Sequence, residues 1–65
     1  MLEPYQQRVV EEKAELDSRI SSLTAFMPTE TFKGLPEAER RRMGRQWWLM
    51  TELSQVLGER IAAFH

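Results

Sequence analysis

The sequence contains no cysteine, and its only histidine is the last residue, His65. Without cysteine the chain can form no disulfide and no zinc or iron–sulfur site built on thiolates. It also lacks a Ser/His/Asp set, metal-ligand spacing and a glycine-rich phosphate loop. We therefore expect a protein without enzymatic activity, metal or other cofactor.

Long apolar runs and a surplus of one charge are also missing. No stretch approaches the roughly 20 apolar residues that cross a bilayer, and the start, "MLEPYQQRVVEEK", does not resemble a signal peptide. We therefore expect no membrane association and a cytoplasmic location. The net charge of −1 gives no overall attraction to nucleic acid.

Glycine and proline are scarce, with three of each, and they cluster in the middle of the chain. Pro28, Gly34 and Pro36 lie within ten residues, which makes this segment the one convincing break in helical structure. The sequence therefore predicts a single domain over 1–65. It has a helix over about 5–26, a connection over 27–35 and a second helix over about 36–64.

Both predicted helices carry an apolar seam with the spacing of packed helices. In the first helix the apolar residues recur every seven positions. In the second helix the seam positions alternate steps of four and three, and Ser54 is the one polar residue among them. Two long helices joined by a short connection pack antiparallel, which predicts an all-α helical hairpin. A single continuous helix is the alternative, and the central break disfavours it. The seams consist of Leu2, Val9, Leu16 and Leu23, and of Met43, Trp47, Met50, Leu57, Ile61 and Phe64.

The second helix has a further apolar stripe, formed by Leu49, Leu53 and Val56. Helix geometry places it about 100° from the seam, so one neighbouring helix cannot cover both. We therefore predict that the hairpin dimerises into a four-helix bundle. The candidate oligomer interface is this stripe together with Trp47.

Three polar residues lie on the seam sides of the two helices: Gln6, Lys13 and Ser54. A polar group at a core position can set the alignment of packed helices. Alternatively, Lys13 lays its aliphatic stem on the core and exposes its amine, and we favour this reading for Lys13.

Trp48 lies outside both stripes of the second helix, among charged neighbours. An exposed tryptophan is typical of an interface anchor. Three readings stay open: a binding site for another molecule, an oligomer contact, or plain surface. The candidate partner-binding residues are Trp48, Arg45, Arg41, Glu52 and Gln55.

The arginine run from Arg40 to Arg45 suggests a second function, because arginine beside an aromatic ring can clamp phosphate and stack on bases. The run nevertheless points in several directions and has acidic neighbours. We favour an ion-pair cluster over a phosphate site. Carboxylates of another chain are candidate partners, namely Glu11, Glu12 or Glu15.

Nearly the whole chain resembles a family of short proteins of tailed bacteriophages and prophages, related to a small protein of crAss-like phages. The resemblance implies a viral accessory protein in the host cytoplasm without an assigned enzymatic activity. Where many members have a tyrosine, this chain has Leu53. The matching positions are Arg8, Val9, Val10, Glu12 and Leu16 in "RVV-x-E-x-x-x-L", then Phe32 and Leu35, then Gln46, Met50, Leu57, Arg60 and Ile61.

The sequence thus leads to three hypotheses of function. The first is a phage accessory protein that binds and modulates a host bacterial protein, in host takeover or anti-defence. The second is binding of nucleic acid or a signalling nucleotide by the Arg40–Arg45 cluster of an oligomer. The third is a structural component of the virion or of its assembly.

Overall fold

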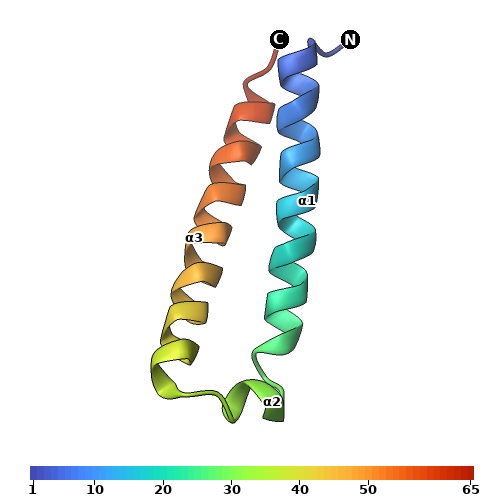
Figure 1. Cartoon of the computed structure of the whole chain (residues 1–65). Helices are drawn as coiled ribbons and strands as arrows, with labels where there is room; N and C mark the ends of the chain where they lie inside the picture. The colour runs from blue at the N-terminus through green and yellow to red at the C-terminus, as the bar shows by residue number, and fades with distance from the viewer.

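Two long antiparallel helices form the molecule, as a computed structural model of all 65 residues shows. The helices are α1 (Pro4–Phe26), α2 (Glu30–Lys33) and α3 (Glu37–Ala62). The two termini lie together at one end, and α2 lies at the other (Figure 1). The hairpin measures 47 × 14 × 14 Å. The all-α hairpin predicted from the sequence is therefore confirmed.

Proline and glutamine define the first turn of α1. Pro4 is the first helical residue, where its missing N–H costs no hydrogen bond. The backbone N–H of Glu3 donates to Oε1 of Gln6 at 2.8 Å, which satisfies a donor that the helix cannot. The helix ends at Phe26, two residues before Pro28. Met27 keeps helical backbone angles, and its N–H still donates to the carbonyl of Leu23 at 3.0 Å, but Pro28 has no N–H with which to continue the helical hydrogen bonds.

A single helical turn, α2, occupies the connection. Thr29 caps it, since its hydroxyl oxygen accepts a hydrogen bond from the backbone N–H of Phe32 at 3.2 Å. The ring of Phe32 meets the ring of Phe26 edge to face, with centroids 5.9 Å apart. α3 then begins directly after Pro36 and ends at Ala62, two residues before the predicted end.

The core between α1 and α3 is small. Only three apolar residues are buried, namely Val9, Leu16 and Leu57, and no large side chain is fully buried. Leu2 precedes α1 and is exposed, so the sequence-based assignment of Leu2 to the seam is wrong. Half-buried side chains extend the core along the interface: Ile20, Met50, Ile61 and Phe64.

Candidate functional site

The second apolar stripe of α3 lies on the surface. Leu49, Leu53 and Val56 keep 55%, 44% and 49% of their surface exposed. These three exposures agree with the excess of apolar residues noted in the sequence. A hairpin has no further helix with which to cover them, so the stripe is available to another molecule.

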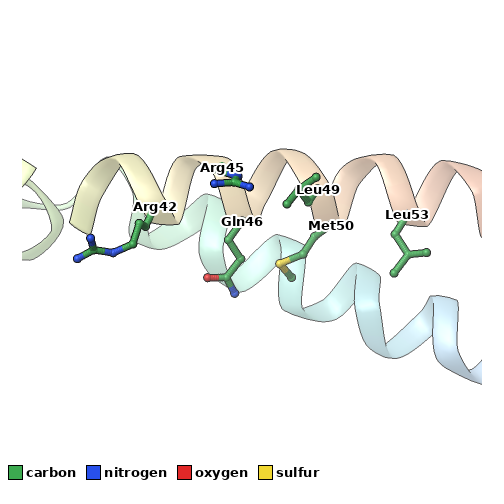
Figure 2. Close-up of a pocket in the computed structure, with 6 residues that line it drawn as sticks. All are labelled: Arg42, Arg45, Gln46, Leu49, Met50 and Leu53. Carbon is green, nitrogen blue, oxygen red and sulfur yellow. The ribbon is translucent and has the colours of Figure 1, made fainter. Parts of the chain in front are cut away.

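A shallow groove of about 390 Å³ runs along this side of α3. Figure 2 shows its side chains spaced along the helix, with arginines at one end and leucines towards the other. The lining of the groove thus combines two arginines with three apolar side chains. Two of its residues, Gln46 and Met50, were not among the predicted site residues, whereas Arg42 belongs to the predicted Arg40–Arg45 cluster. Their signal is the position of Gln46, which lies three residues before Leu49 and four before Met50 on the same helix. The lining residues are Arg42, Arg45, Gln46, Leu49, Met50 and Leu53.

The arginine run is partly neutralised from within its own helix. Arg41 pairs with Glu37 at 2.8 Å, and Arg42 pairs with Glu39 at 2.9 Å. An ion-pair cluster was expected, but carboxylates of another chain are not needed for these two pairs. The glutamates lie in the first turn of α3, where the helix dipole also favours negative charge.

The remaining two arginines of the run differ from each other. Arg40 donates from Nε to the backbone carbonyl of Leu35 at 3.1 Å and so holds the connection against α3. Arg45 has no carboxylate partner in the structure. Arg45 is therefore the uncompensated cation of the run, and it lines the groove.

The two adjacent tryptophans have different surroundings. Trp47 is half-buried, and its indole N–H donates to the hydroxyl oxygen of Thr24 at 2.7 Å, which links α3 to α1. Trp48 is 56% exposed and takes part in neither of the aromatic pairs of the structure. Trp47 thus holds the hairpin together, while Trp48 offers a free aromatic surface. The residues predicted beside Trp48 are exposed as well, and among them only Arg41 takes part in an ion pair. They are Arg41, Arg45, Glu52 and Gln55.

A polar network joins the helices at mid-length. The ammonium of Lys13 donates to Asp17 at 2.8 Å and to the hydroxyl oxygen of Ser54 at 2.9 Å. The Ser54 hydroxyl in turn donates to Asp17. The prediction that Lys13 exposes its amine is wrong, because the amine donates hydrogen bonds to Asp17 and Ser54 at the interface between α1 and α3. The sequence analysis missed Asp17, which lies one turn after Lys13.

This network also changes the acidity of Asp17. The hydrogen bond from Lys13, followed by that from Ser54, lowers the pKa of the Asp17 carboxyl from its ordinary value of 3.8. Both bonds favour the ionised carboxylate over the protonated acid. The network is therefore charged and satisfied, which suits a structural role in alignment.

The structure contains neither a metal-binding cluster nor a membrane-spanning helix. No group of three or more histidine, cysteine, aspartate or glutamate side chains is placed to hold a metal ion. None of the helices is both long enough and apolar enough to span a bilayer.

Comparison with known proteins yields one match. The sequence model of the family described as Sequestin matches residues 3–63. No curated protein and no solved structure matches the chain.

Proposed function

Because this chain belongs to the Sequestin family, we propose that it captures a target molecule and holds it without changing it chemically. The name of the family hints at sequestration of another molecule. The surface that supports this role is the side of α3 around Trp48, where Arg45 and Arg41 lie one and two turns earlier on the helix. The proposal includes the bacteriophage context that the sequence resemblance implies, with capture serving host takeover or anti-defence.

A signalling nucleotide is the target class that this surface supports best. Trp48 presents an exposed ring on which a base can stack. Arg45 supplies a cation without a carboxylate partner, and its planar guanidinium suits phosphate. The sequence alone ranks a host protein first. The uncompensated Arg45 beside an exposed aromatic ring reverses that order, and this is the single observation that carries the proposal.

Calorimetric titration of the purified protein with cyclic and linear mono- and dinucleotides tests this proposal. We expect binding that weakens with added salt, because cation–phosphate contacts are screened. Trp48→Ala and Arg45→Ala should each weaken it at least tenfold. Arg60→Ala is the matched control, since Arg60 is also exposed and without an ion pair but lies near the other end of α3.

The fate of the ligand separates capture from catalysis. Denaturing the loaded protein should release the nucleotide with its mass unchanged. Released products of different mass would contradict sequestration. Absence of binding to every nucleotide tried, or equal binding by wild type and Trp48→Ala, would overturn the assignment of this surface to a nucleotide.

A host bacterial protein is the second candidate target. The mixed surroundings of Trp48 favour it, because Glu52 and Gln55 are exposed beside the ring and add acceptors as well as donors. An exposed tryptophan within a polar rim is typical of a protein-binding hot spot. Affinity capture from nuclease-treated bacterial lysate tests it. One host protein retained by wild type and lost with Trp48→Ala would support this target, and retention by both would contradict it.

A further inference from the structure

We propose that the exposed stripe of Leu49, Leu53 and Val56 is covered by a second copy of this chain. The two copies pack antiparallel about a two-fold axis close to Leu49. In this arrangement Arg42 of each copy lies against Glu12 of the other. Trp48 points about 100° away from Leu49 around α3, and Arg45 borders both surfaces. The inference goes beyond the proposed capture of a ligand and does not depend on it.

The apolar core of a single hairpin is small. A hairpin of 65 residues with only three buried apolar side chains is expected to be marginally stable on its own. The chain has no disulfide or metal cluster to compensate. A partner that buries more apolar surface is the remaining source of stability.

An interface between two copies must cover enough of the surface of each hairpin. A stable interface covers about 800 Å² on each partner. The hairpin has 5049 Å² of accessible surface, so such an interface would cover roughly a sixth of it. The groove and a neighbouring hollow share Leu53, so the exposed stripe and the arginine stems beside it are continuous with that hollow along one side of the hairpin.

Positive and negative side chains lie at different positions along this side of the hairpin. On one side of Leu53 the groove is basic, with Arg42 and Arg45 in its lining. On the other side, a smaller hollow of about 140 Å³ has Glu12, Glu15 and Arg19 in its lining. Arg19 pairs with Glu15 at 2.5 Å, so Glu12 is the uncompensated charge of this hollow. The same side of the hairpin is thus positive towards the connection and negative towards the termini. A second copy placed antiparallel brings the positive end of each over the negative end of the other.

The spacing of these residues along α3 determines the position of the two-fold axis. Arg42 and Leu53 are eleven residues apart, which is about 16 Å along a helix. A two-fold axis close to Leu49 places Leu49 against its own copy. The stem of Arg42 then covers Val56 of the other copy. Its guanidinium, which pairs through Nε with Glu39 of its own helix at 2.9 Å, also reaches Glu12 of the other copy, which has no ion pair within its own chain. Apolar contact and charge therefore agree on one arrangement.

Charge reversal with sedimentation equilibrium tests this arrangement. Wild type should form a dimer of twice the 7.7 kDa chain mass. Arg42→Glu alone and Glu12→Arg alone should each raise the dissociation constant about tenfold, because each homodimer then opposes two like charges. An equimolar mixture of the two variants should recover the wild-type constant, because each heterodimer then contains two attractive pairs. Arg41→Glu is the matched control and should have little effect.

Cysteine crosslinking tests the axis. Since the chain lacks cysteine, Leu49→Cys introduces one thiol for each copy, and oxidation should link two chains. Val56→Cys should not crosslink, because in the antiparallel dimer the two copies of residue 56 are about 21 Å apart. Efficient crosslinking at both positions would indicate a parallel arrangement and overturn the proposal. A monomeric wild type, or a mixture that does not recover dimerisation, would also overturn it.

The same measurements on Trp48→Ala keep the two proposals separate. This variant should still dimerise with the wild-type constant. Loss of nucleotide binding with an intact dimer would concern only the ligand surface. Loss of the dimer in Trp48→Ala would place Trp48 in the interface and contradict the arrangement proposed here.

Discussion

The ammonium nitrogen of Lys13 lies 2.9 Å from the hydroxyl oxygen of Ser54, across the interface between α1 and α3. Ser54 is buried, so its hydroxyl has little access to water. The bond connects residues 41 positions apart in the chain. It therefore fixes the alignment of the two helices, which apolar contacts alone leave free to slide.

Replacement of the serine should destabilise the hairpin. Ser54→Ala removes, at a buried position, the hydrogen bonds that the hydroxyl makes with the charged groups of Lys13 and Asp17. We expect a loss of about 1–3 kcal/mol in the free energy of unfolding. Urea titration followed by circular dichroism measures it. Ser21→Ala, an exposed position on α1, is the control and should change stability by less than about 0.5 kcal/mol. Equal stability of the two variants would show that the network contributes nothing.

The acidity of Asp17 predicts how stability depends on pH. Its pKa is lowered in the folded state, first by the hydrogen bond from Lys13 and then by that from Ser54. The contribution of Asp17 is therefore fully present above the unfolded value of 3.8 and is lost as pH falls through the lower folded value. Urea titrations of wild type and Asp17→Asn from about pH 6 to about pH 2 should converge at the acidic end. A constant difference between them across this range would contradict the role of Asp17.

Two glycines of α3 provide a matched pair. Glycine inside a helix costs roughly 1 kcal/mol relative to alanine. At Gly44 an added Cβ meets nothing within 4 Å, so Gly44→Ala should stabilise the hairpin by about that amount. At Gly58 an added Cβ would lie 3.3 Å from Cε of Lys13, and the lysine would have to move. Gly58→Ala should therefore gain less than Gly44→Ala or lose stability, as thermal unfolding of both variants would show. A larger gain at Gly58 would mean that the lysine moves freely.

The hairpin itself could be predicted from the sequence because its signals repeat. Apolar residues recur at helical spacing over many turns, and glycine and proline interrupt them once. Each of these signals depends on several residues, so the misplacement of Leu2 did not affect the prediction. The exposed stripe beside Leu49 could also be predicted, since it follows from helix geometry alone.

The direction of single polar side chains could not be predicted in this way. Whether Lys13 turns towards solvent or towards α3 depends on Asp17 one turn later and on the missing Cβ of Gly58 on the opposite helix. Those groups meet only in the folded hairpin. Arg41 and Arg42 are a different case, because their glutamate partners lie four and three residues earlier on their own helix, a spacing that the sequence itself contains.

The leucines of α3 distinguish folding from assembly. Leu57 is the most buried residue, with 2% of its surface exposed, whereas Leu53 belongs to the exposed stripe. Leu57→Ala should reduce the free energy of unfolding by about 2–5 kcal/mol, because it removes buried methyl groups and leaves a cavity. That is a large share of the 5–15 kcal/mol typical of a folded domain. Circular dichroism during urea titration should detect the loss.

Protein concentration provides the control for this comparison. Leu53→Ala leaves the core of the hairpin intact and weakens only the proposed contact between copies, so the stability that it loses comes from association. Association stabilises the folded state by mass action. The deficit of Leu53→Ala should therefore shrink towards zero as wild type and variant are diluted below the dissociation constant of the wild-type dimer. The deficit of Leu57→Ala should persist at every concentration. If both deficits were independent of concentration, Leu53 would contribute to the hairpin itself, and the stripe would not be an interface between copies.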